Sequence, residues 1–228
     1  MTTVLIVAAH PDDAELAMGG TIAKMVAYNW KIIIIDLTDG EPTPFGSKEI
    51  RAKEASNAST VLGIEKRICL NMPNRYLQPD LENRELLAEA IRSHQPDMLF
   101  APALPDWHPD HHSANALTES ARFTAKYHKT DMSGQPHWTP KMYYYLSPHR
   151  LQYPSPSLVV DISECWQKKE MAIKAYQSQL KNCSGNAIGL LEKIEISNKY
   201  FGSCINAKYG EPFLSCEPIC VSDIRFFE

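Results

Sequence analysis

The sequence predicts an α/β fold with a Rossmann-like, doubly wound and mostly parallel sheet that carries helices on both faces. Strand and helix patterns alternate through the first half of the chain, which favours parallel strands joined by crossover helices. Two segments, residues 2–9 and 31–38, are mostly apolar runs that read as strands. The second is rich in β-branched residues, as expected of a strand covered on both faces. The 228 residues suffice for one α/β domain, and we expect a single domain over residues 1–228.

The elements of the first half follow from apolar spacing and from residues that start or stop helices. The expected strands are 2–9, 31–38, 67–72 and 97–102. The expected helices are 12–29, 48–63, 82–95 and 109–127. Ser47 is placed to cap the second helix, Gly63 ends it, and Pro96 stops the third.

The second half of the chain is less regular, and we expect the part from about residue 130 to form substrate or oligomer surface. The expected strands are 141–147, 157–163 and 218–227. The expected helices are 164–180 and 189–205. Segment 153–157 is rich in proline and reads as a connector.

Composition excludes several classes of protein. The formal net charge is −4 and no Lys/Arg-rich stretch occurs, so we expect no nucleic-acid partner. No apolar run approaches the roughly 18 residues of a membrane span, and we expect no membrane contact. The N-terminus lacks a basic region followed by an apolar one, so we expect a cytoplasmic protein. The six cysteines are expected to be reduced and mostly buried.

The tripeptide His-Pro-Asp occurs twice, in His10-Pro11-Asp12-Asp13 and in His108-Pro109-Asp110-His111. Each copy follows a predicted strand and opens a predicted helix. Proline is favoured at the first helical position, which would make each leading histidine the helix cap. Residues three apart share a helix face, so the first and fourth residues of each copy are expected to converge. Within a helix, Asp12 would project about 100° away from Asp13.

In an open parallel sheet, ligand sites lie outside the carboxyl ends of the strands, so the two copies are expected to meet across one crevice. Together they offer imidazoles and carboxylates but no thiolate. Three such ligands with an open fourth position describe a catalytic zinc site. The alternative is structural, with the histidines as helix caps and the aspartates as first-turn carboxylates.

The motifs "AHPDDAE" and "HPDH" resemble those of the LmbE-like, or PIG-L, family of zinc-dependent N-deacetylases that act on N-acetylglucosamine derivatives. The resemblance extends over essentially the whole chain. Further similar segments are 38–41, 51–64, 172–180 and 199–213. The last two are most similar to the bacillithiol-biosynthesis branch, whose members deacetylate N-acetylglucosaminyl malate.

The resemblance implies a role for each residue of the two motifs. The implied zinc ligands are His10, Asp13 and His111. Asp12 would be the general base for the attacking water. His108 would be a cationic histidine that stabilises the oxyanion and protonates the leaving amine. Asp110 would orient His108 and raise its pKa.

Outside the motifs, the resemblance points to four substrate-binding candidates: Arg51, Glu41, Tyr209 and Glu211. A surface salt bridge is the alternative role for Arg51, and loop capping is the alternative for Glu41. Many relatives carry an arginine soon after a Pro-His pair, where this chain has Trp138. If that arginine grips an anionic aglycone, Arg150 is the residue placed to substitute for it.

The implied activity is removal of acetate from a GlcNAc-type small molecule, with N-acetylglucosaminyl malate as the expected substrate, by a homo-oligomer that could be a hexamer. The alternatives are an amidase for a thiol conjugate and a deacetylase of another derivative such as a chito-oligosaccharide. A binding or assembly protein is disfavoured because no proposed ligand or acid/base residue is missing. A dinucleotide-binding oxidoreductase is disfavoured because Gly19-Gly20 comes too late for a G-x-G-x-x-G turn.

Overall fold

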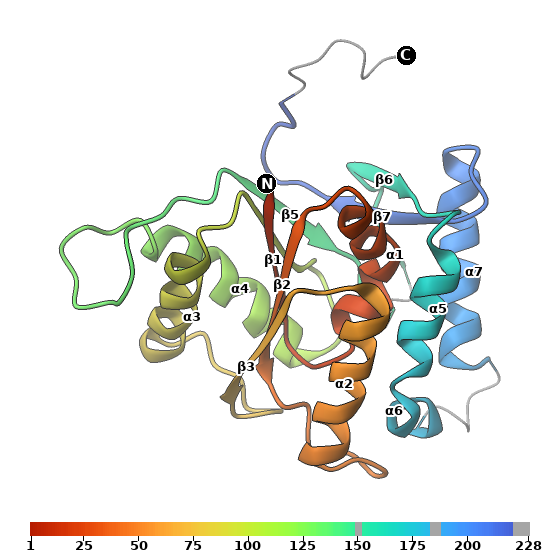
Figure 1. The fold of residues 1–228 in the computed structure, drawn as a ribbon, viewed down its shortest axis with the longest axis horizontal. Helices are drawn as coiled ribbons and strands as arrows, with labels where there is room; N and C mark the ends of the chain where they lie inside the picture. The colour runs from red at the N-terminus through yellow and green to blue at the C-terminus, as the bar shows by residue number, and fades with distance from the viewer. Residues whose placement is uncertain (149–151, 183–187, 221–228) are drawn as a thin grey trace.

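The structure, a computed structural model, describes residues 1–148, 152–182 and 188–220, and one mixed sheet lies at its centre (Figure 1). Among these residues the sheet has seven strands in the order β3-β2-β1-β4-β5-β7-β6. The strands are β1 Thr3–Ala8, β2 Lys31–Thr38, β3 Lys66–Met72, β4 Met98–Pro102, β5 Lys141–Tyr145, β6 Leu158–Asp161 and β7 Gly210–Leu214. Within that set, β7 alone runs in the direction opposite to the other six strands, so the prediction of a mostly parallel sheet is confirmed.

Helices cover both faces of the sheet. They are α1 Asp13–Ala27, α2 Lys48–Leu62, α3 Leu81–His94, α4 Pro109–Thr124, α5 Trp166–Lys174, α6 Gln177–Asn182 and α7 Leu190–Cys204. Figure 1 shows α3 and α4 on one side of the strands and α1, α2 and α5 on the other. The doubly wound arrangement expected from the alternating pattern is therefore present.

Alternation along the central strand feeds two separate core layers. Leu5 and Val7 of β1 pack with the side chains of α3 and α4, whereas Val4 and Ile6 pack with those of α1 and α2. All four side chains are fully buried. A strand covered on both faces needs an apolar residue at every position, which explains the unbroken apolar run near the N-terminus.

The residues predicted to start and end α2 do so. The Ser47 side chain accepts a hydrogen bond from the backbone N–H of Ile50, and Gly63 ends the helix with φ of 77°. That φ is accessible to glycine without the steric cost that other residues meet. Ser47 fixes where the loop before α2, which borders the site, joins the helix, and Gly63 turns the chain toward β3.

Three elements of the second half differ from expectation. The helix predicted over 164–180 is two helices, α5 and α6. Strand β7 falls in a segment that was not predicted to be a strand, because its sequence Gly-Glu-Pro-Phe-Leu lacks an alternating pattern. Residues 218–220 form no strand, and the remainder of the strand predicted to end the chain lies outside the described residues.

The exposure of the cysteines differs from the expectation. The expectation of mostly buried cysteines is wrong, since four of the five described cysteines are exposed: Cys69, Cys204, Cys216 and Cys220. All five are free thiols, as expected of a reduced protein.

Within the described ranges, the helices are all too short or too polar to span a bilayer.

The strand order reverses between β1 and β4. From β1 the chain proceeds to β2 and β3 on one side, and it returns to the other side for β4 and β5. Such a reversal leaves a crevice at the carboxyl ends of the two central strands. The first motif follows β1 and the second follows β4, so both reach this crevice.

The fold makes a prediction about the sheet's contribution to stability. Ile34 lies fully buried in β2, and Ile34→Ala should lower the free energy of unfolding by about 2–5 kcal/mol, because it removes buried methyl groups and leaves a cavity. Urea denaturation followed by circular dichroism measures the change. The matched control is Ile50→Ala on the surface of α2, where 46% of the side chain is exposed and the change should stay within about 0.5 kcal/mol. Equal losses for the two variants would contradict the assignment of the core.

Candidate metal centre and catalytic site

The first motif lies at the end of β1, and its backbone differs from the expected one. The helix α1 begins at Asp13, and Asp12 occupies the cap position with φ of 120°. Pro11 therefore lies in the turn before the helix, and His10 is not the cap. The expected convergence is nevertheless present, because Asp13 Oδ2 accepts the backbone N–H of His10 at 2.9 Å and lies 3.4 Å from His10 Nδ1.

The second motif has the expected geometry. His108 caps α4, with Pro109 at the first helical position, and His108 Nδ1 accepts the backbone N–H of Asp110 at 3.2 Å. The rings of His108 and His111 stack with their centroids 4.9 Å apart. The first and fourth residues of this copy therefore share one face of the helix, as their spacing predicts.

The two motifs meet directly across the crevice. His111 Nε2 lies 3.2 Å from Asp13 Oδ1, and the rings of His10 and His108 have centroids 4.7 Å apart. Ring nitrogens of His10, His108 and His111 lie within 4.8 Å of one another, close enough to hold one metal ion. The residues expected to be zinc ligands, His10, Asp13 and His111, are thus in contact with each other.

Each candidate ligand histidine has a second carboxylate on its other ring nitrogen. His10 Nε2 lies 3.1 Å from Asp110 Oδ2, and His111 Nδ1 lies 3.0 Å from Asp106 Oδ2. Metal-binding histidines typically donate their second N–H in this way, which fixes the ring and raises its basicity. The contacts leave His10 Nδ1 and His111 Nε2 on the side of Asp13, so the donor set fits a divalent metal ion that accepts nitrogen and oxygen ligands.

The charged groups of the centre shift one another's pKa values. Burial alone would lower the pKa of both histidines, but contacts with carboxylates raise the pKa of His10 to about 9 and that of His111 to about 10. Burial would raise the pKa of Asp13, but His111 and His10 hold it well below its usual range. A metal ion would take the place of the two ring protons, since a ring nitrogen holds either the proton or the metal.

Asp12 and Arg51 form a buried pair beside the candidate ligands. Arg51 Nη2 lies 3.1 Å from Asp12 Oδ2, and both residues are buried. Burial raises the pKa of Asp12 to about 7, against the opposing effect of the Arg51 guanidinium. Arg51 therefore forms no surface salt bridge. Among the described residues, its Nε and Nη1 have no hydrogen-bond partner.

Asp110 contacts a different histidine from the expected one. Its carboxylate lies against His10 and accepts the backbone N–H of Arg75 at 2.8 Å, whereas its own backbone N–H is the group that bonds to His108. The pKa of His108 is lowered to about 4 by burial and by the positive charges of His10 and His111. Without a bound metal ion, His108 is therefore neutral at pH 7 rather than cationic.

The other substrate-binding candidates lie outside the cavity that borders these residues. Glu41 uses its carboxylate within its own loop, where it accepts from the backbone N–H and the hydroxyl of Thr43. Tyr209 stacks on Trp166 with ring centroids 4.4 Å apart. Glu211 is fully buried in β7 and accepts backbone hydrogen bonds from α1.

The cavity beside the centre has a volume of about 230 Å³. Its lining includes His10, Asp12, Asp13, Arg51 and His108, and also three residues that were not expected: Asn74, Arg75 and Gln179. No motif in the sequence indicates that Arg75 would line the cavity. It follows β3 with φ of 67°. Asp106 was also missed, although it stands only two residues before His108.

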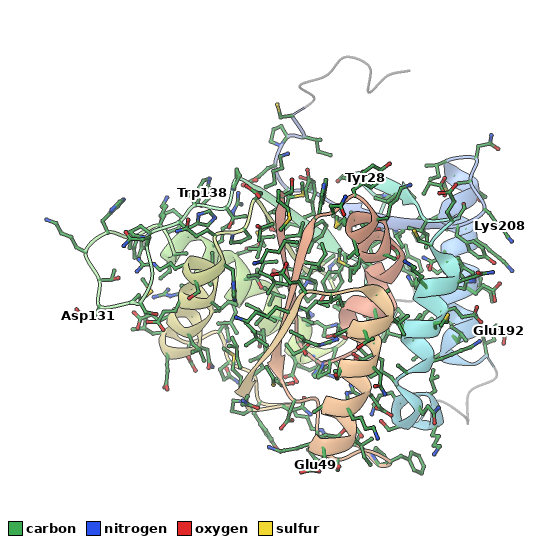
Figure 2. All side chains as sticks on the ribbon, in the orientation of Figure 1. Tyr28, Glu49, Asp131, Trp138, Glu192 and Lys208 are labelled. Atoms are coloured by element: carbon green, nitrogen blue, oxygen red, sulfur yellow. The ribbon has the colours of Figure 1, made fainter. Side chains whose placement is uncertain are left out.

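Trp138 lies away from this cavity. Its ring packs against the guanidinium of Arg122, 4.2 Å from the ring centroid. Figure 2 shows it near the end of the sheet opposite to Glu49, which stands at the start of α2. Arg150, the residue expected to compensate for it, lies outside the described residues.

The fold and the site together define an α/β protein with a His/Asp cluster that could hold a metal ion at the carboxyl edge of its sheet. Residues 5–122 match the family described as PIG-L, GlcNAc-PI de-N-acetylase. The chain belongs to the PIG-L family and is an N-deacetylase, an enzyme that hydrolyses amide bonds.

Three relatives extend the match beyond the family segment. A conserved protein from Thermus thermophilus is 35% identical, with a TM-score of 0.89 and 97% of each chain covered. Diacetylchitobiose deacetylase from Thermococcus kodakarensis is 28% identical over 77% of this chain and 69% of its own length. The N,N'-diacetylchitobiose deacetylase of Pyrococcus horikoshii is 26% identical, with a TM-score of 0.78 and with 93% of this chain and 82% of that chain covered. The likeness therefore extends over nearly the whole chain.

The geometry predicts that metal binding depends on the second motif. His111→Ala should weaken zinc binding by at least about a hundredfold, because it removes a ligand rather than a hydrogen-bonded neighbour of one. Competition with a chromophoric chelator measures the affinity. His137→Ala is the control, because His137 is a partly buried histidine that contacts the carbonyl of Pro96 instead of the cluster. Unchanged zinc affinity of His111→Ala would remove the second motif from the metal centre.

Proposed function

We propose that this chain removes the acetyl group from the N-acetylglucosamine moiety of a small glycoconjugate, with a zinc ion held by His10, Asp13 and His111. The observation that carries the proposal is the meeting of two carboxylate-supported imidazoles with Asp13 beside a cavity. Membership of a family of GlcNAc de-N-acetylases supports the reaction type. When bound, zinc polarises the amide carbonyl and makes an attacking water more acidic.

Asp12 is the group we assign to accept the proton of that water. Its carboxylate lines the cavity next to Asp13, and burial brings its pKa to about 7, near the optimum for a proton acceptor at neutral pH. The Arg51 guanidinium at 3.1 Å holds the carboxylate in place and favours its ionised form. In the reaction, the water oxygen bonds to the acetyl carbon, and its proton passes to Asp12.

We assign His108 to the developing oxyanion. Because His108 Nδ1 accepts a backbone N–H, the proton of the neutral ring is on Nε2, and the ring lines the cavity. A neutral ring stabilises an oxyanion by hydrogen bonding but does not readily give up its own proton. The proton held by Asp12 is then the one that reaches the leaving nitrogen as the C–N bond breaks. This differs from the acid role that the family resemblance implies for His108.

We further propose that the sugar carries an anionic aglycone, with N-acetylglucosaminyl malate as the substrate. A cavity of about 230 Å³ is small and suits one sugar unit, so the aglycone would lie at its mouth. Arg75 lines the cavity, is exposed, and donates to the neutral carbonyl of Pro42. Within the described residues, no carboxylate forms an ion pair with its guanidinium. The relatives named as diacetylchitobiose deacetylases favour a neutral disaccharide instead.

The first prediction of the proposal concerns the base. Asp12→Asn should lower kcat by about 10²- to 10⁴-fold, because the amide cannot accept the proton. Acetate release measures the rate, and zinc affinity measured in parallel should stay close to that of the unchanged protein. Retained turnover in Asp12→Asn would exclude this residue as the base.

The second prediction concerns the aglycone. Acetate release should be fastest from N-acetylglucosaminyl malate, compared with diacetylchitobiose, free N-acetylglucosamine and an acetylated thiol conjugate. Arg75→Gln should raise KM for the malate glycoside and leave KM for diacetylchitobiose unchanged, because only the former carries carboxylates. Lys53→Gln, which removes a surface cation of α2 away from the cavity, is the control.

The outcomes separate the candidate substrates. Faster release from diacetylchitobiose, with no effect of Arg75→Gln, would favour the chito-oligosaccharide alternative. Faster release from the thiol conjugate would favour the amidase alternative. Inactivity on every compound, by a protein that binds zinc, would reject the proposed function and leave the metal centre intact.

A further inference from the structure

The helix that carries Asp13 is broken after little more than one turn. Met18 has φ of −136° and ψ of 23°, outside the helical range, so α1 consists of a short first segment, 13–17, and a longer second one from Gly19. In an unbroken helix, each backbone N–H bonds the carbonyl four residues earlier. The break removes such partners inside the protein, where unpaired backbone groups are costly.

Two charged side chains from distant parts of the chain replace the lost partners. Glu211 of β7 accepts the backbone N–H groups of Gly20 at 2.9 Å and of Thr21 at 2.6 Å. Lys169 of α5 reaches the carbonyl of Ala17 at 3.4 Å. Glu211 therefore caps the start of the second segment, and Lys169 caps the end of the first.

These caps also pair with each other. Lys169 Nζ lies 2.6 Å from Glu211 Oε1, and both side chains are fully buried. The glycines of α1 make the approach possible, since a Cβ on Gly19 would lie 3.2 Å from Lys169 Cγ. On Gly20, a Cβ would lie 2.6 Å from Ile162. A fully buried ion pair is weak evidence for added stability, because an apolar pair of similar volume often serves as well. Its position at the break indicates a different role.

The short first segment is held at both of its ends. Near its start, Glu15 accepts a hydrogen bond from Arg67 and another from the hydroxyl of Tyr176 at 3.0 Å. Near its end stand Lys169 and Glu211. Asp13 is the first residue of this segment, so the direction of its carboxylate depends on the orientation that these contacts give to a single helical turn.

We propose that Glu211 and Lys169 are positioning residues for the metal centre. They set the angle between the two segments of α1, and through it they aim Asp13 at His10 and His111. The inference rests on the proposed metal centre and assigns these two residues no contact with substrate. It also explains why Glu211 lies outside the cavity although its segment resembles a family segment near the site.

Glu211→Gln tests the proposal through zinc affinity, with no need for turnover. The amide can accept only one of the two N–H groups and leaves Lys169 without a counter-charge. Zinc affinity, measured by chelator competition well below the unfolding temperature, should fall by about tenfold to a hundredfold, the usual effect of losing support behind a metal ligand. Near-UV circular dichroism of the same samples confirms that the protein is folded.

The double variant Lys169→Met/Glu211→Leu separates positioning from stability. It removes both buried charges, so its stability should exceed that of Glu211→Gln, but the N–H groups of the break stay uncapped. Zinc affinity should therefore remain low while stability recovers. Recovery of both together would overturn the proposal, because the pair would then act only through the stability of the fold.

A matched control is Arg92→Met. Arg92 is a buried charge that donates to the carbonyls of Ala125, Tyr127 and Met132, away from α1. This variant should lose stability and keep its zinc affinity. Glu211→Gln with unchanged zinc affinity would overturn the proposal whatever its activity. An unchanged protein that binds zinc but releases no acetate would reject the proposed function while leaving this inference standing, and one that binds no zinc would reject both.

Discussion

The parallel pairing of β1 with β4 is the contact on which the site depends. Leu5 pairs with Leu99 and Ile6 with Phe100, so the two strands end at the same edge of the sheet. The order of the strands reverses at this pair, and the helices that follow leave to opposite faces. The edge between them therefore stays open, and two motifs far apart in the sequence face each other there.

The same tripeptide performs two different tasks because its backbone differs in the two places. Asp110 lies in the first turn of α4, where its carboxylate supports His10. Asp12 precedes α1 with φ of 120°, a conformation that costs roughly 1–3 kcal/mol for a residue other than glycine. The contact with Arg51 accompanies this conformation and holds the carboxylate beside the cavity. The strained backbone thus places the Asp12 carboxylate next to that of Asp13. The ion-pair partner of Asp12 is Arg51, whereas Asp13 contacts the histidines.

The convergence of the candidate metal ligands could be predicted because its signal is local. A strand, a proline and two residues spaced by three suffice to place His108 and His111 on one helix face. The partner of Asp110 could not be predicted in this way, because spacing favours a neighbour on its own turn, whereas the contact crosses to the other motif. The position of Glu211 was equally inaccessible, since its strand has no alternating pattern and its partners in α1 lie 190 residues away. The expected homo-oligomer and cytoplasmic location stay predictions.

The buried charges of the molecule are balanced in a way that suits a divalent cation. Arg51 faces Asp12, Arg67 faces Asp36 and Glu15, and Lys169 faces Glu211, so these carboxylates have permanent partners. Asp13 is different, because its partners are two histidines that carry protons in the protein alone. If a divalent cation binds and both rings release their protons, two positive charges replace two others, and the net charge of the centre does not change. The surrounding ion pairs then have no electrostatic reason to rearrange, so the same framework that holds the protonated centre is already suited to the metal-bound one.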